Sequence, residues 1–257
     1  EYAFEDMLDN DGVRDVALRI ALKLKIDGDR LALDFSGTSP ACAGPVNISR
    51  ATAIAACYVA LKHLFPDVPA NAGVLDAVDV VLPDGLVISA DRPRPVGGYT
   101  ETILRMIDVI FCAMAQAAPE RAMAQAYGTI NALSIAGYRS DTARKGQRWV
   151  MFSFFGGGHG GHSDGDGLSH GNAPISTATI PPLEILEAAY PVRFTQWALR
   201  PDSAGDGAHR GGLGAIYEIE LLEDSAEAFI FGERGRSAPK GIAGGGQAAL
   251  NAVSYTH

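Results

Sequence analysis

The sequence predicts an α+β fold with antiparallel-rich sheets, two main helices and a second half that is mostly β. Three features indicate this fold: a two-residue apolar alternation near residue 20, two long helix-like stretches before residue 120, and a series of short strand-like runs after residue 128. The 257 residues are 47% hydrophobic and 20% charged, which is the ordinary composition of a folded globular protein.

The clearest strand is predicted over residues 16–26, where the even-numbered residues are apolar and three odd-numbered ones are charged. A turn-forming run follows at 27–30, and the alternation resumes over 31–35. We therefore expect an antiparallel hairpin whose second strand leads into the segment Asp34-Phe35-Ser36-Gly37-Thr38.

Two helices are expected next. Residues 49–65 are rich in alanine, contain no glycine or proline and are followed directly by a proline, which predicts a helix that ends there. A second helix is predicted to begin with Thr100 as its N-cap, because apolar residues from Ile103 to Met114 lie on one helical stripe. Within it, Glu101 and Arg105 are expected to form an i,i+4 pair.

The remaining elements are short. Residues 74–82 are a strand candidate, and 86–89 is a candidate to pair back with it. After residue 128 we expect strands at 130–138, 149–155, 192–199, 216–222 and 228–233, with one short helix near 182–188. The polar run 139–147 is a surface loop or a boundary, and it divides the chain into a mixed α/β part at 1–140 and a β-rich part at 148–257.

Charge and composition exclude several classes of partner. The formal net charge of −9 argues against nucleic acid, which needs clustered Lys and Arg on one face. The apolar stretches are interrupted by polar residues before they reach the roughly 20 residues that span a bilayer, so no membrane association is predicted. Three distant cysteines fit reduced thiols, which favours a cytoplasmic location.

A glycine-rich segment at 156–170 contains three of the six histidines and two aspartates. His159 and His162 are candidate metal ligands there, because imidazole and carboxylate groups suit Zn, Mn or Fe. Two alternatives stay open: a loop whose polar side chains bond backbone groups or line a subunit interface, and a loop that lines a substrate site.

Asp34 and Ser36 are candidate catalytic residues, because they present a carboxylate and a hydroxyl at the end of a strand. The same residue types also form ordinary turns, so a structural role is the alternative. The sequence contains no phosphate-binding loop of the G-x-x-x-x-G-K-[ST] type and no G-x-S-x-G elbow, which argues against ATP binding by these loops and against a serine hydrolase.

Ordered landmarks run along nearly the whole chain. They are Tyr2-x-Phe4-Glu5-Asp6-x-Leu8-Asp9-x-Asp11-Gly12, Asp34-Phe35-Ser36-Gly37-Thr38-Ser39-Pro40, Gly44-Pro45-x-Asn47, Pro69-x-Asn71-x-Gly73, Gly156-Gly157-Gly158, Asp166-Gly167, Arg200-Pro201-Asp202-Ser203-x-Gly205 and Arg210-Gly211-Gly212-Leu213-Gly214. In this order they resemble the hydantoinase B family, which includes the B half of 5-oxoprolinase and, more remotely, subunits of acetone and acetophenone carboxylases.

The resemblance implies a subunit of an ATP-dependent cyclic amidohydrolase that opens hydantoin, N-methylhydantoin or 5-oxoproline rings. It also implies a hetero-oligomer in which a hydantoinase A-type, actin-like ATPase subunit holds the ATP. Two alternatives remain: a component of an ATP-dependent carboxylase of the acetone or acetophenone type, and a non-catalytic assembly subunit.

The landmarks also imply which residues line substrate or interface loops: Asn47, Asn71, Gly157, Gly158, Asp166 and Arg210. Family members usually carry upstream Thr-His-x-x-Asp and His-His-x-Asp-x-Gly-Gly segments that look like metal or active-site ligands. We therefore expect any divalent metal to be bound mainly by residues upstream of this chain.

Overall fold

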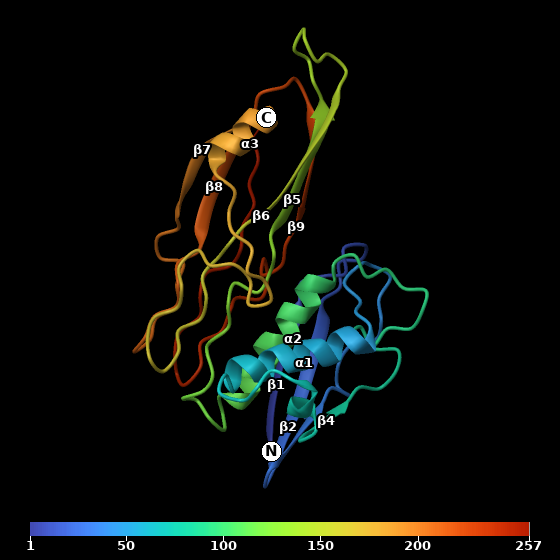
Figure 1. The fold of residues 1–257 in the computed structure, drawn as a ribbon, viewed down its shortest axis with the longest axis vertical. Helices are drawn as coiled ribbons and strands as arrows, with labels where there is room; N and C mark the ends of the chain where they lie inside the picture. Colours follow the sequence, from blue (N-terminus) through green and yellow to red (C-terminus); the bar gives the residue numbers. More distant parts are fainter. Residues whose placement is uncertain (257) are drawn as a thin grey trace.

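A four-stranded sheet covered by two long helices forms the first lobe of the computed structural model, which describes residues 1–256 (Figure 1). We call it the N-terminal lobe, and its strand order is β1-β2-β3-β4. Its elements are β1 (Tyr2–Leu8), β2 (Leu18–Asp27), β3 (Arg30–Asp34), α1 (Arg50–Leu64), the 3₁₀ turn η1 (Ala72–Leu75), β4 (Val78–Val81) and α2 (Tyr99–Met114). The predicted hairpin is confirmed, because β2 and β3 pair antiparallel across the turn at 27–30.

The first predicted helix is also confirmed. Ser49 is the N-cap of α1, and its side chain accepts a hydrogen bond from the backbone N–H of Thr52. The helix ends at Leu64, just before Phe65 and Pro66. Three of its alanines, Ala53, Ala56 and Ala60, are buried in the core of the lobe, where small side chains let α1 approach its neighbours closely.

The prediction for residues 74–89 was partly wrong. The strand is shorter than predicted and comprises only β4. The residues before it form the η1 turn, which Asn71 caps. β4 pairs parallel with the free edge of β3, and Leu86 bridges Pro40 in place of pairing back with β4.

The predicted start of α2 was wrong by two residues. The helix begins at Tyr99 after Gly98, and no side chain caps it, so Thr100 is not the N-cap. Gly98 lies against the ring of Phe231, where a Cβ atom would approach to 2.3 Å. The approach of the second lobe therefore determines how this helix starts.

α2 is buried on all sides over residues 101–114, not only along the predicted stripe. The expected Glu101–Arg105 pair is replaced by buried ion pairs from Arg105 to Asp6 (3.0 Å) and Glu233 (3.7 Å). These partners come from β1 and from the chain after β9 (Ala226–Phe231), so α2 lies at the junction of the two lobes.

The second lobe, which we call the β lobe, contains two small antiparallel sheets and one helix (Figure 1). One sheet has the order β6-β5-β9 and the other pairs β7 with β8. Its elements are β5 (Ala132–Tyr138), β6 (Arg148–Phe154), α3 (Leu183–Ala189), β7 (Val192–Leu199), β8 (Ala215–Leu221) and β9 (Ala226–Phe231). The predicted strands are confirmed to within a few residues, and the second half is mostly β.

The polar run 139–147 is the connection between β5 and β6, which pair with each other along their whole length. The division of the chain at residues 140–148 stays a prediction. Within residues 1–256, no helix is long and apolar enough to cross a membrane.

Candidate functional site

Three glycine-rich loops pack backbone against backbone at the base of the β lobe: 156–167, 203–214 and 240–247. A Cβ atom on Gly158 would lie 2.0 Å from the carbonyl oxygen of Gly212, and one on Gly167 would lie 2.0 Å from that of His159. The loops also exchange backbone hydrogen bonds, such as Gly212 N to His159 O at 2.8 Å. Glycine is needed here because any side chain would separate the loops.

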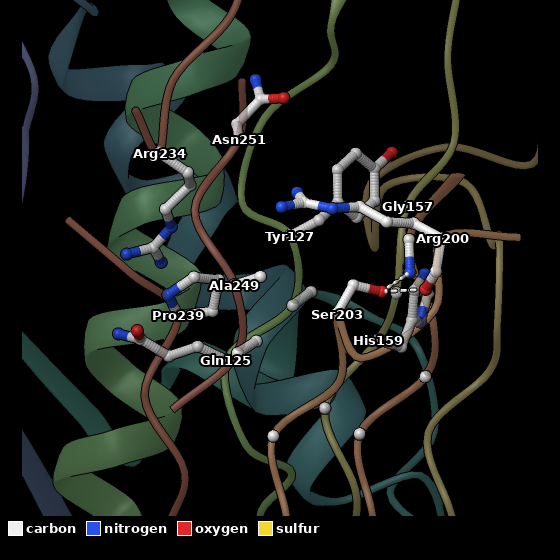
Figure 2. Close-up of a pocket in the computed structure, with 18 of the residues that line it drawn as sticks. Gln125, Tyr127, Gly157, His159, Arg200, Ser203, Arg234, Pro239, Ala249 and Asn251 are labelled. Atoms are coloured by element: carbon white, nitrogen blue, oxygen red, sulfur yellow. Dashed lines mark hydrogen bonds between the residues drawn. The ribbon is translucent and has the colours of Figure 1, made fainter. Parts of the chain in front are cut away.

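A cleft of about 1410 Å³ opens between these loops, the inner sides of β5, β8 and β9, and the C-terminal segment 234–255. Its walls combine glycine backbone with aromatic and polar side chains, among them Gln125, Tyr127, His159, Arg200 and Asn251 (Figure 2). Tyr217 lines it as well. Concave sites of this composition, mostly apolar with a few polar groups, are typical of small-molecule binding.

The two candidate metal ligands both line the cleft but are engaged separately. His159 Nε2 lies 2.5 Å from the carbonyl oxygen of Asn172, so this nitrogen carries the proton, and burial lowers the pKa of the imidazole. His162 accepts a hydrogen bond from the backbone N–H of Asp164 through Nδ1 (3.3 Å).

Across residues 1–256, no group of three or more His, Cys, Asp or Glu side chains is placed to hold a metal ion. The described residues therefore do not form a complete metal site, and metal binding by His159 and His162 stays a prediction.

A histidine that the sequence left without a role forms a hydrogen-bonded cluster beside the cleft. Trp197 donates its indole N–H to Nε2 of His170 (3.0 Å), and the hydroxyl of Tyr217 lies 2.5 Å from the same nitrogen. An indole N–H can only donate, so Nε2 is an acceptor and His170 is neutral with its proton on Nδ1. Burial, which lowers the pKa of His170, agrees with this state.

The cluster directs the hydroxyl of Tyr217, which lines the cleft. The hydroxyl has two acceptors within the protein, Nε2 of His170 (2.5 Å) and the carbonyl oxygen of Gly156 (3.2 Å), so its hydrogen is used internally and the tyrosine oxygen offers only lone pairs to a ligand. It is therefore suited to accept an N–H group. Positions 170, 197 and 217 are far apart in the chain, and no sequence pattern could have brought them together.

A buried network of charged side chains includes Arg234, which lines the cleft. Asp6 on β1 contacts Arg105 on α2 (3.0 Å) and Arg234 (2.8 Å), and Arg234 also contacts Asp108 (2.5 Å). These side chains are at most 3% exposed. Gln125 donates to Asp6 as well (2.9 Å). The network joins both lobes to the segment that begins at Arg234 and forms one wall of the cleft.

The carboxyl groups in and beside this network have pKa values shifted in opposite directions. Burial opposes the charge of Asp6, yet Arg105 and Arg234 together hold its pKa well below the usual range. Burial raises the pKa of Glu101 and of Glu233 to about 7. These two groups therefore gain a proton far more easily than surface glutamates do.

The structure places Asp34 and Ser36 away from the cleft, in the turn after β3. Both the backbone N–H and the hydroxyl of Ser36 donate to Oδ1 of Asp34, at 2.8 and 2.5 Å, which is a local turn. Asn47 is fully buried, and its Nδ2 donates to the carbonyl oxygens of Cys42, Gly44 and Pro95. Asn71 caps the η1 turn.

The other predicted loop residues belong to the base of the β lobe. Gly157 and Gly158 line the cleft, and Gly157 lies against the ring of Tyr127. Asp166 accepts a hydrogen bond from the backbone N–H of Arg210 (2.9 Å) and lies 3.6 Å from its side chain, which ties two glycine-rich loops together. Their roles toward a substrate or an interface stay predictions.

Comparison with known proteins matches residues 1–257 to a family described as Hydantoinase B/oxoprolinase. The chain is 32% identical to 5-oxoprolinase 1 of Arabidopsis thaliana over 98% of this chain and 18% of that protein. It superposes on ATP-dependent caprolactamase from Pseudomonas jessenii with a TM-score of 0.71 and 25% identity, covering 86% of this chain and 39% of that one.

A third likeness is to a nucleotide-free structure of acetone carboxylase, with a TM-score of 0.81 and 20% identity over 97% of this chain and 35% of that one. At this identity the match concerns the fold alone. The chain spans between 18% and 40% of the length of the curated relatives that it matches.

Proposed function

Because the chain belongs to the hydantoinase B/oxoprolinase family, we propose that it is part of a subunit of an ATP-dependent cyclic amide hydrolase. The subunit opens a hydantoin-, N-methylhydantoin- or 5-oxoproline-like ring in a cytoplasmic hetero-oligomer with a hydantoinase A-type ATPase subunit, which holds the ATP. The family match over residues 1–257 carries this proposal, and the likeness to ATP-dependent caprolactamase at 25% identity supports it.

The chemistry of the cleft supports a cyclic amide as the ligand. A ring amide presents an N–H and a carbonyl oxygen on the same edge, and hydrolysis of an unactivated lactam is slow or uphill, so coupling to ATP is needed. The oxygen of Tyr217 can accept the ring N–H, since its own hydrogen is used within the protein by His170 and Gly156. The glycine-lined walls let a small ring approach backbone groups closely.

The test is turnover by the full-length subunit, purified together with its ATPase partner. ADP formation and ring opening are measured with hydantoin, N-methylhydantoin and 5-oxoproline, with and without bicarbonate. ATP-coupled ring opening without bicarbonate is the expected result. Absence of ring opening for every ring, in a complex that hydrolyses ATP, would contradict the proposal.

The two alternatives are outcomes of the same experiment. Carboxylation of a ketone only with bicarbonate would identify a carboxylase component. A non-catalytic assembly subunit predicts that substituting His159, His162 or Asp34 leaves turnover unchanged in a stably assembled complex. Tyr217→Phe distinguishes this last case from the main proposal, because it removes the oxygen that accepts the ring N–H and should raise KM about tenfold.

A further inference from the structure

Arg200 brings a positive charge into the cleft without an ion-pair partner among residues 1–256. Of the residues that line the cleft in that range, two are arginines, Arg200 and Arg234. Arg234 is neutralised by Asp6 and Asp108. The guanidinium of Arg200 donates instead to a neutral acceptor, the carbonyl oxygen of Leu250, at 2.7 Å. The two arginines therefore differ in what they can still bind.

The backbone of Arg200 is held firmly at the end of β7. Its N–H donates to the carbonyl oxygen of Gly214 (2.8 Å), and its own carbonyl accepts from the hydroxyl of Ser203 (2.7 Å). The same hydroxyl accepts from the N–H of Gly214 (2.9 Å). Figure 2 shows the side chain of Arg200 extending from this anchored turn across the cleft, toward the side on which Asn251 lies. The guanidinium is thus preorganised.

The electrostatic situation of this guanidinium calls for a counter-charge. Arg200 is half-buried, and a charge withdrawn from water is normally paired. One of its five N–H groups bonds Leu250, which leaves a planar fork that matches the geometry of a carboxylate or a phosphate. Lys240, another cation on the cleft wall, lies instead over the ring of Phe4 at 4.9 Å.

We propose that Arg200 anchors an oxyanion of the ligand that occupies the cleft. This inference rests on the proposed function, which offers two sources for the oxyanion: the carboxylate carried by a ring such as 5-oxoproline, and a phosphoryl group placed on the ring by the ATP-using partner. Both are recognised through the same paired N–H···O contacts.

The experiment measures equilibrium binding to the assembled complex by calorimetry, without ATP. The ligands are 5-oxoproline, 2-pyrrolidinone, which is the same ring without the carboxylate, and inorganic phosphate. We expect Arg200→Gln to weaken the binding of at least one oxyanion about tenfold or more and to leave 2-pyrrolidinone unchanged. Arg200→Lys should retain part of the affinity because it keeps the charge.

Arg193→Gln is the matched control, since Arg193 lies on β7, which ends just before Arg200, but is exposed and pairs with Glu220 outside the cleft (3.2 Å). A loss confined to 5-oxoproline assigns the anchor to the ring carboxylate, and a loss confined to phosphate assigns it to a phosphoryl group. A loss shared by both oxyanions supports the anchor for either source.

Two results would overturn the proposal. One is an unchanged affinity for both oxyanions, including the case in which the wild-type complex binds neither. The other is an equal loss for all three ligands, which would mean that Arg200 only holds the C-terminal segment through Leu250. The proposed function fails separately, if the wild-type complex binds a ring but never opens it with ATP.

Discussion

Asp6 occupies a position in β1 that would ordinarily hold an apolar residue. Its neighbours on the same side of the strand, Phe4 and Leu8, pack into the core, whereas Asp6 neutralises Arg105 and Arg234 inside it. Removing one member of a buried ion network leaves the others without compensation, which is more destabilising than the intact network is stabilising.

We therefore expect Asp6→Asn to lower the free energy of unfolding by about 3–5 kcal/mol, measured by urea denaturation. The control is Asp79→Asn, which breaks an exposed pair with Arg30 (2.9 Å) and should change the stability by at most about 1 kcal/mol. Equal effects of the two substitutions would show that the buried network contributes no more to the free energy of unfolding than an exposed ion pair does.

Glu101 and Glu233 predict an unusual dependence of stability on pH. Burial raises the pKa of each from its ordinary value of 4.5 to about 7, so the folded state binds more protons than the unfolded state between these pH values. The contribution of both groups to stability is therefore full below about pH 4.5 and is lost as the pH rises through about 7.

Glu101→Gln keeps the shape of the side chain and its acceptor for the N–H of Ile130 (3.0 Å) but removes the titration. The variant should match the wild type near pH 4.5 and be more stable near pH 8, by on the order of 3 kcal/mol. Urea unfolding at several pH values measures this. Glu220→Gln, at an exposed pair, should leave the pH profile unchanged, and parallel profiles for Glu101→Gln and the wild type would refute the assignment.

At the scale of elements, the packing of the glycine-rich loops depends on particular residues as much as the packing of the strands does. Gly158→Ala would bring a Cβ atom to 2.0 Å from the carbonyl oxygen of Gly212, so the two loops must separate. We expect a loss of about 1–3 kcal/mol in the free energy of unfolding. Gly165→Ala in the same loop meets only two side-chain atoms of His162, at 3.6 and 3.9 Å, and should be nearly neutral. If Gly158→Ala left the free energy of unfolding unchanged, the two loops would be able to move apart at little cost, which would contradict this prediction.

Most elements could be predicted because their signals are local. The alternation in β2 and the alanine-rich run of α1 are visible within a few residues. β1 was missed because Asp6 interrupts the apolar face of the strand, and the start of α2 was misplaced because Phe231 from the β lobe, not a capping side chain, packs there. In both cases a contact distant in sequence overrode the local pattern.

At the scale of the whole molecule, the two lobes are tied together. The buried network joins β1 and α2 of the N-terminal lobe to the chain after β9. Within the β lobe, β5 and β6 pair across the 139–147 loop, so the parts of the chain before and after that loop share one sheet. Cleavage at a protease site engineered into residues 141–146 should leave both fragments in one particle on size-exclusion chromatography, separable only in denaturant. Fragments that separate without denaturant would support two independent units at 1–140 and 148–257.

The sequence by itself determined the fold class, the family resemblance and most of the secondary structure, because these depend on periodicity and on ordered local motifs. Only the tertiary structure decided which residues form the cleft. It left Asp34 and Ser36 in a local turn and brought Arg200 and Tyr217 together with the glycine-rich loops. The physical reason is that buried charges and backbone close contacts join residues such as Asp6 and Arg234, which are at opposite ends of the chain.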